Sequence, residues 1–287
     1  SNIMERLVQL YNTLTGKSSC KCEKIPGGGS NRCYYRLSAE DGTFKMIGAI
    51  GTSLEENNAF IALSKHFSSL SLPVPKIYAV SDDGLAYLQS DLGNRCLYDA
   101  LKGGRESSAG YQAKDISLLE KTIRLLPRIQ VLGGESLDFS VCYPQESMDE
   151  QNVLFDLNYF KYCFLKTTDV DFNEMKLEQC FRSMAKDLSN ESSNYFMYRD
   201  FQSRNVMLRD GEPFFIDFQG GRRGPLYYDL ASFVWQPRAA FPAELREKLT
   251  ESYIAALSEY MTVERSEFDY QLGLFILFRL LQILGAY

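Results

Sequence analysis

Residues 198–217 read YRDFQSRNVMLRDGEPFFID and combine a hairpin signal with three oxygen-bearing side chains. Asp210-Gly211 is a strong signal for a two-residue turn, and an apolar run lies on each side of it. The runs 206–208 and 214–216 are expected to pair as antiparallel strands, which brings Asn205 and Asp217 together at the open end. Pro213 cannot donate a ladder hydrogen bond, so the register close to the turn stays open.

Asp200 lies five residues before Asn205, on a segment too polar to continue the strand, and is expected to curl over the same end. Carboxylate and amide oxygens suit magnesium, which keeps several coordination positions for substrate phosphates. The pattern predicts a phosphoryl-transfer site. Asn205 and Asp217 would hold Mg²⁺ against the phosphates of ATP, and Asp200 would accept the proton of an attacking hydroxyl. An ordinary hairpin with acidic ends is the simpler alternative.

The following residues extend the pattern. Residues 218–225 read FQGGRRGP, and 226–234 is expected to be a short helix that carries Asp229. The order YRDxxxxN, ID, RGPxxYDLA resembles the aminoglycoside-phosphotransferase branch of the protein-kinase-like fold. Within that branch it is similar to bacterial kinases of N-acetylmuramic acid and N-acetylglucosamine, which also read RDFxSRNxM and carry GGGS(D/N)R. The second motif is matched here by Gly27, Gly28, Gly29, Ser30, Asn31 and Arg32.

The resemblance implies an α+β, bilobal protein-kinase-like fold. A small antiparallel β-sheet with a helix would form the N-lobe (1–88), which carries the glycine-rich nucleotide loop. Residues 89–95 would be the hinge, and 96–287 a mainly helical C-lobe with the catalytic hairpin and the substrate cleft.

The resemblance also implies roles for single residues. The hinge of the family offers backbone groups to adenine, which makes Gln89 and Asp91 candidate nucleotide contacts. Tyr198 replaces the more usual histidine and would pack under the catalytic loop. Asp229 would be a buried carboxylate that accepts backbone N–H groups of that loop. Arg204 would steady a phosphate or pair with an acid.

The glycine run has a physical reading of its own. It lies between the segment 23–26 and the alternating segment 33–37, and a turn at Asp41-Gly42 then leads to 44–50. Without a Cβ, the backbone N–H groups of such a loop can approach phosphate closely. A plain flexible turn is the alternative. No Gly-Lys-Ser/Thr follows, which argues against a P-loop NTPase.

The phosphate-binding lysine of kinases is missing from its usual strand position. Lys45 comes about three residues too early, and Gly48 lies near the expected place. Arg32 or Arg36 could supply the cation instead, and Lys45 could be a solvated charge at the strand edge. The same departure motivates one alternative function, a nucleotide-binding regulatory module without turnover.

The remaining pattern is mostly helical. Ser53-x-x-Glu56 is a capping box that opens a helix. Glu55 and Glu56 are expected to serve in capping, and the alternative is that one of them is the partner of the phosphate-binding cation. Further helices are expected at 97–101, 116–132, 153–165, 175–188, 243–261 and 268–284. The polar loop 133–152 between two of them is a candidate rim of the substrate cleft.

Composition limits the function classes. The 287 residues carry a net charge of −6, and the basic residues form no stripe, which argues against a nucleic-acid partner. The apolar run 272–284 contains Arg279 and Gln282 and is expected to be too short to span a membrane. Seven scattered cysteines indicate a reducing cytoplasm. A single histidine, His66, argues against a Ser-His-Asp triad or a multi-histidine metal centre.

The sequence therefore predicts a cytoplasmic small-molecule kinase that uses ATP and Mg²⁺ and phosphorylates a hydroxyl of a sugar or amino sugar. An aminoglycoside-modifying kinase is an alternative, for which the acids within 146–156 could line the acceptor pocket. A protein kinase would need a longer activation segment than 218–225. We also expect further residues after Tyr287, either covering Phe275, Phe278 and Leu281 or leading into another domain.

Overall fold

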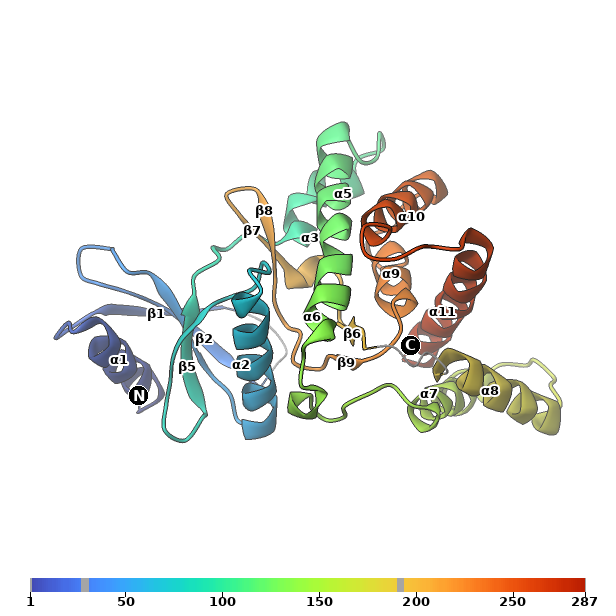
Figure 1. Cartoon of the computed structure of the whole chain (residues 1–287), viewed down its shortest axis with the longest axis horizontal. Coiled ribbons are helices and arrows are strands. Elements are labelled where there is room, and N and C mark those ends of the chain that lie inside the picture. Colours follow the sequence, from blue (N-terminus) through green and yellow to red (C-terminus); the bar gives the residue numbers. More distant parts are fainter. Residues whose placement is uncertain (1, 27–30, 190–193, 287) are drawn as a thin grey trace.

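A five-stranded antiparallel sheet dominates the first third of the computed structural model, which describes residues 2–26, 31–189 and 194–286 (Figure 1). The strand order is β1-β2-β3-β5-β4. The strands are β1 (Lys21–Ile25), β2 (Cys33–Ser38), β3 (Met46–Ile50), β4 (Ile77–Val80) and β5 (Ala86–Ser90). Successive side chains along each strand point to opposite faces of the sheet, so each face needs its own cover.

Two helices cover the sheet, one on each face (Figure 1). Helix α1 (Asn2–Thr15) buries Leu7 and Tyr11 in a small core on one face. Helix α2 (Leu54–Ser69) packs on the other face, where the ring of Phe60 lies 5.8 Å from that of Tyr87. The sequence analysis expected one helix in this part of the chain and missed α1.

The start of α2 differs in one respect from the predicted capping box. The Ser53 hydroxyl accepts the backbone N–H of Glu56 at 3.3 Å, as expected of an N-cap. The Glu56 carboxylate instead lies 3.7 Å from the guanidinium of Arg32. The second cap bond was therefore wrongly predicted, because a cation from the glycine-loop segment provides a stronger partner for this carboxylate.

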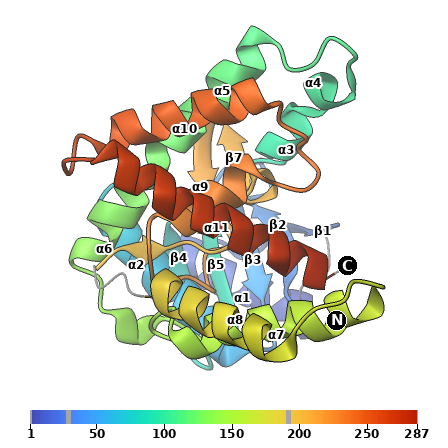
Figure 2. The ribbon, with the colours of Figure 1, turned by 90° about the vertical axis from the view of Figure 1, so that its right-hand side faces the viewer.

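The rest of the chain is mainly helical (Figure 2). The helices are α3 (Leu97–Ala100), α4 (Lys102–Glu106), α5 (Ala113–Pro127), α6 (Gly133–Glu135), α7 (Glu150–Cys163), α8 (Glu174–Ser189), α9 (Tyr227–Val234), α10 (Ala243–Leu257) and α11 (Arg265–Gly285). A π-helical turn, Arg128–Leu132, joins α5 to α6. Short 3₁₀ turns occur at Phe139–Val141, Leu165–Thr167 and Ser203–Asn205.

Two small antiparallel ladders lie among these helices. Strand β6 (Phe196–Met197) pairs with β9 (Arg222–Arg223), and β7 (Val206–Arg209) pairs with β8 (Glu212–Phe215). An aromatic cluster joins them to α2. The ring of Phe218 lies 4.9 Å from that of Phe60 and 5.4 Å from that of Phe67. This packing fixes the β7–β8 hairpin against the sheet-bearing part of the chain.

Helix α11 corrects two expectations. With 21 residues and a mean hydropathy of 1.3 in its most apolar window, it is the one described helix long and apolar enough to cross a membrane, so the expectation that it is too short was wrong. A single such helix is weak evidence, since core helices pass the same test. Of the three residues expected to be covered by a further segment, Phe275 and Phe278 are buried by the described chain itself, and Leu281 is half-buried.

Candidate active site

The hairpin brings Asn205 and Asp217 together as the sequence predicts. Arg209 pairs with Glu212 across the two-residue turn, whose residues Asp210 and Gly211 have φ of 53° and 78°. Positive φ at both positions is typical of the type I′ turn that suits hairpins. At the open end, the backbone N–H of Ile216 donates to the carbonyl of Asn205 at 3.0 Å. Asp217 follows directly, with φ of 60°.

Asp200 completes the group. It follows β6, and its backbone carbonyl accepts the Asn205 Nδ2–H at 2.8 Å, which leaves the amide oxygen of Asn205 available. The Asp200 side chain has exposed surface, yet protein atoms surround it closely. This partial burial, with the charge of Asp217, raises the pKa of Asp200, and the charges of Arg199, Arg279 and Arg222 oppose the rise.

A buried network holds the catalytic loop in place. The Asp229 carboxylate, fully buried, accepts the backbone N–H groups of Tyr198 and Arg199, both at 2.8 Å. Burial raises the pKa of Asp229 to about 7, against the effect of these donors. Arg199 has φ of 78°, an unfavourable conformation for a residue with a side chain. The two bonds from Asp229 stabilise that conformation next to Asp200.

Tyr198 and Gln130 extend the same network. The Tyr198 ring is buried, and its hydroxyl donates to the carbonyl of Ile216, which connects the catalytic loop to the hairpin end. The Gln130 side chain donates to Asp229 at 3.2 Å and accepts the Tyr253 hydroxyl at 2.6 Å. The sequence analysis missed Gln130 and Tyr253, because no local pattern shows that residues about a hundred positions apart share one network.

The residues around Asp217 offer oxygen ligands for a cation. The Gln219 side chain donates to the Asp217 carboxylate, and its own Oε1 is buried without a hydrogen-bond partner among the described residues. Within the described ranges, no three His, Cys, Asp or Glu side chains gather into a metal site by themselves. A hard cation would therefore use the amide oxygens of Asn205 and Gln219 with Asp217, and substrate oxygens would complete its coordination.

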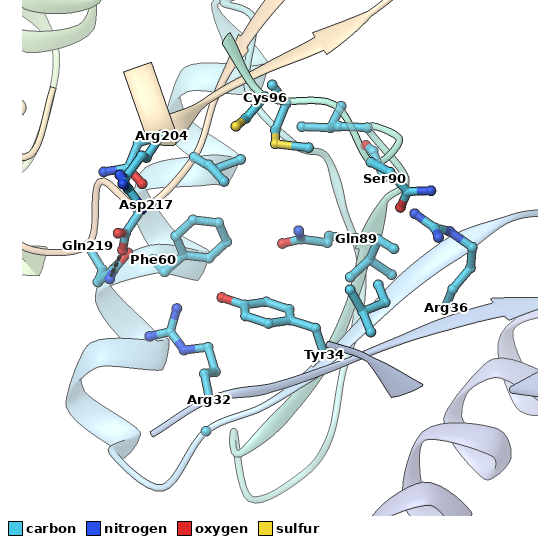
Figure 3. Close-up of a pocket in the computed structure, with 18 of the residues that line it drawn as sticks. Arg32, Tyr34, Arg36, Phe60, Gln89, Ser90, Cys96, Arg204, Asp217 and Gln219 are labelled. Atoms are coloured by element: carbon cyan, nitrogen blue, oxygen red, sulfur yellow. Dashed lines mark hydrogen bonds between the residues drawn. The ribbon is translucent and has the colours of Figure 1, made fainter. Parts of the chain in front are cut away.

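A cavity of about 1110 Å³ adjoins this group (Figure 3). The sheet lines it with Tyr34, Ile47 and Gln89, and the hairpin lines it with Asn205 and Asp217. The volume is sufficient for a nucleotide, since ligand pockets usually enclose about 300–1,000 Å³. Gly27, Gly28, Gly29 and Ser30 lie outside the described residues.

The predicted nucleotide contacts divide into two sets. Asn31, Arg32 and Gln89 line the cavity. Asp91 does not: its carboxylate binds the Arg36 guanidinium at 2.7 and 3.1 Å and accepts the Gly93 N–H at 2.9 Å. The Asp91 side chain is thus occupied by Arg36, while Ser90 and Leu92 on either side of it line the cavity, so a contact of Asp91 with nucleotide through its backbone stays a prediction.

The structure distinguishes between the residues that could replace the missing phosphate-binding lysine, namely Lys45, Arg32 and Arg36. A Cβ at Gly48 would lie 2.8 Å from Leu37, on the α1 side of the sheet, so Gly48 faces away from the cavity, and Lys45 is exposed. In Figure 3 the Arg32 guanidinium points into the cavity on the side of Asp217, whereas Arg36 lies at the opposite end. Arg32 is thus the cation in the position to contact phosphates, with Glu56 beside it.

Arg204 lines the cavity close to Asn205. Its guanidinium lies 4.3 Å from the ring centre of Tyr98, a cation–π contact. In the described part of the chain no carboxylate forms an ion pair with it. Of the two predicted roles for Arg204, the pairing with an acid is therefore absent from these residues.

Comparison with known proteins agrees with this geometry. The chain belongs to the phosphotransferase enzyme family, whose model matches residues 21–266. It is 27% identical over 207 residues to the N-acetylmuramate/N-acetylglucosamine kinase of Neisseria meningitidis serogroup B, covering 71% of this chain and 58% of the relative. The kinase of the same name from Pseudomonas aeruginosa is 24% identical over 213 residues, covering 72% and 58%. The chain thus spans less than two thirds of these relatives.

The fold also matches solved structures. An amicoumacin kinase in complex with AMP-PNP, Ca²⁺ and Ami superposes with a TM-score of 0.63 at 13% identity, covering 92% of this chain and 80% of that chain. At such identity the likeness concerns the fold alone. It confirms the protein-kinase-like fold class expected from the sequence.

Proposed function

We propose that the protein is an ATP-dependent kinase that transfers the γ-phosphate to a hydroxyl of a sugar or amino sugar. The observation that carries the proposal is the position of Asn205 and Asp217 in the lining of a nucleotide-sized cavity, with Asp200 next to them: its backbone carbonyl bonds to Asn205, and its carboxylate interacts with that of Asp217. The names of the two relatives support a sugar as the acceptor. Seven free cysteines suit a cytoplasmic enzyme, which is part of the same proposal.

Asp200 would be the general base. Its pKa is raised by burial and by Asp217, which increases its affinity for the proton of an attacking hydroxyl, and the charges of Arg199, Arg279 and Arg222 oppose the rise. Asn205 and Asp217, with Gln219, would hold Mg²⁺, which when bound neutralises charge on the transferred phosphate. Asp229 and Tyr198 would be positioning residues, since they contact the catalytic loop rather than the reactants.

Arg32 would take the place of the missing lysine. Its side chain is 7% exposed and lies over the Phe60 ring at 5.8 Å, so packing and Glu56 hold it inside the cavity. A planar guanidinium can bind two phosphate oxygens at once. A cation in this position weakens the case for a regulatory module without turnover. The glycine loop of residues 27–30 would cover the phosphates, and residues 1–88 and 96–287 would be the two lobes.

The aminoglycoside alternative required acids at the acceptor pocket. Asp149 instead caps α7 by accepting the N–H of Asn152 at 2.8 Å, and Asp156 accepts from Gln282 at 2.9 Å. Glu146 and Glu150 are exposed. Asp149 and Asp156 are thus engaged with other groups of the chain, and the names of the two relatives favour a sugar as the acceptor.

The test is acceptor-dependent ADP release with MgATP. A panel of neutral sugars, amino sugars, acidic sugars and aminoglycosides would be compared at equal concentration, with and without Mg²⁺. The proposal expects turnover with a sugar or amino sugar, dependent on Mg²⁺. Turnover with aminoglycosides alone would contradict it, and nucleotide binding without any turnover would favour a regulatory module.

A further inference from the structure

One polar side chain in the lining of the nucleotide cavity has no partner for its amide. Gln89 lies on β5, a strand whose five residues are all buried, and it is 7% exposed. Its Oε1 is buried without a hydrogen bond, and the other described residues provide no hydrogen bond to its Nε2 either. Burying an amide without partners is costly, and native proteins rarely do so. The position therefore indicates that a ligand supplies the partner.

Two other amides in the same lining are held more firmly. Asn57 donates to two backbone carbonyls, at 3.2 and 3.1 Å. Gln219 donates to the carboxylate of Asp217. Each of these side chains has one oxygen without a partner among the described residues, but its NH₂ group fixes its orientation. Gln89, in contrast, can turn its amide by 180° without breaking a hydrogen bond to any described residue.

Gln89 lies where the base of a bound nucleotide would be. In Figure 3 its amide end lies in the cavity between Asp217 and Arg32 on one side and Arg36 on the other. The phosphates belong on the side of Asp217 and Arg32, as proposed above. The sugar and the base then extend from there toward Gln89.

The cavity around Gln89 suits a flat, largely apolar ring. Ile47, which pairs with Gln89 across the β3–β5 ladder, lines it from the sheet, and Met207 and Ile216 line it from the hairpin side. Ligand pockets typically combine such apolar walls with a few polar groups that fix orientation. The far edge of a purine, opposite its bond to the sugar, carries the substituent at C6. This substituent is an amino group in adenine and an oxo group in guanine and hypoxanthine.

We infer that the Gln89 amide binds the substituent at C6 of a purine base and lets the cavity accept both 6-amino and 6-oxo purine nucleotides. An amide offers an acceptor oxygen and a donor NH₂ group. The oxygen accepts a hydrogen bond from a 6-amino group. After a half-turn of the amide, the NH₂ group donates to a 6-oxo group.

The inference makes Gln89 a specificity-determining residue through its side chain, in addition to the backbone contacts expected of the hinge. It rests on the proposed function, because it takes the cavity as the nucleotide site. It extends that function by adding 6-oxo purine triphosphates to ATP as phosphate donors.

The test is calorimetry with three nucleoside diphosphates in the presence of Mg²⁺. ADP carries an amino group at C6, IDP carries an oxo group, and purine riboside 5′-diphosphate carries only hydrogen. IDP is chosen instead of GDP because it lacks the additional amino group at C2. The wild type is compared with Gln89→Met and Gln89→Asn. Gln179→Met is the matched control, since Gln179 is exposed on α8 and does not line the cavity.

We expect ADP and IDP to bind the wild type within about tenfold of each other, and both to bind about 10-fold more tightly than the unsubstituted compound. Gln89→Met should reduce this preference to about twofold or less, because methionine fills a similar volume without an amide. Gln89→Asn keeps an amide and should retain more of the preference. The control should match the wild type.

Two results would overturn the inference. One is a wild type that binds the unsubstituted compound as tightly as ADP, or that separates ADP from IDP by more than about tenfold. The other is a preference that Gln89→Met leaves unchanged. The three-way comparison in the wild type decides the first point even if Gln89→Met proves unstable.

Turnover separates this inference from the proposed function. Phosphorylation of the sugar panel would be measured with ATP and with ITP as donors. A preference for C6 substituents that is lost in Gln89→Met, without phosphorylation of any acceptor, would retain the base subsite and refute the kinase. Phosphorylation of a sugar by ATP, with equal binding of nucleotides with and without a C6 substituent, would retain the kinase and refute the base subsite.

Discussion

Replacing Asp229 by asparagine tests the network beneath the catalytic loop. In the wild type the carboxylate accepts three hydrogen bonds, two from backbone N–H groups at 2.8 Å and one from Gln130 at 3.2 Å. An asparagine side chain has one oxygen, so its NH₂ group must face one of the donors. We therefore expect loss of one bond to a charged acceptor and weakening of the others.

The magnitude follows from these bonds. A hydrogen bond to a charged group contributes about 1.5–3 kcal/mol, and a neutral one about 0.5–1.5 kcal/mol. Burial of the carboxylate carries a free-energy cost, which raises the pKa of Asp229 to about 7. Asparagine is uncharged and avoids this cost, which offsets part of the loss. We expect the free energy of unfolding to fall by about 2–4 kcal/mol at pH 8, which lowers Tm by about 3–7 °C for a chain of this size.

The assay is guanidinium unfolding followed by tryptophan fluorescence. Trp235 is the single tryptophan and lies directly after α9, which carries Asp229, so its signal reports this region. Asp210→Asn is the matched control, because asparagine also adopts the positive φ of this turn position. The control should stay within about 0.5 kcal/mol of the wild type. If Asp229→Asn did the same, the network would not support the loop.

Three further predictions concern the nucleotide and the base. Asp217→Ala should abolish Mg²⁺-dependent ATP binding in calorimetry, since the cation loses its carboxylate, and equal affinities would exclude the hairpin end as the metal site. Arg32→Gln should raise KM for ATP about 10-fold or more, while Lys45→Gln should change it less than twofold; the opposite order would restore the lysine to the phosphate role. The pKa of Asp200 is raised, so kcat/KM should fall on acidification at a pH above the ordinary aspartate value of about 3.9, and Arg279→Gln should move this fall to higher pH. If the acidic fall of kcat/KM in Arg279→Gln stayed at the wild-type pH or moved to lower pH, the titrating group would not be Asp200.

Local signals in the sequence predicted the hairpin and the start of α2. The Asp210-Gly211 turn and the Ser53 N-cap each depend on a few neighbouring residues, and both are present in the structure. The buried position of Asp229 came from the family motif rather than from local physics. Its hydrogen bonds to the catalytic loop match that expectation.

Contacts between distant segments could not be read from the sequence. The partner of Glu56 is Arg32 rather than its own helix start, and Asp91 binds Arg36, because both acids meet cations from other strands or loops. The arginine cluster around Asp200 joins a loop, a strand and a helix that lie up to 80 positions apart. No periodicity or spacing marks such a group.

The most direct test of the account compares Asp200→Asn with Asp210→Asn. Both make the same chemical change, but only Asp200 lies next to Asn205 and Asp217, whereas Asp210 lies in the turn at the other end of the hairpin. We expect Asp200→Asn to lower kcat by about 10²- to 10⁴-fold, the contribution of a positioned general base, with MgATP affinity nearly unchanged. Asp210→Asn should retain wild-type turnover. Wild-type kcat in Asp200→Asn on the same acceptor would contradict the assignment of this site.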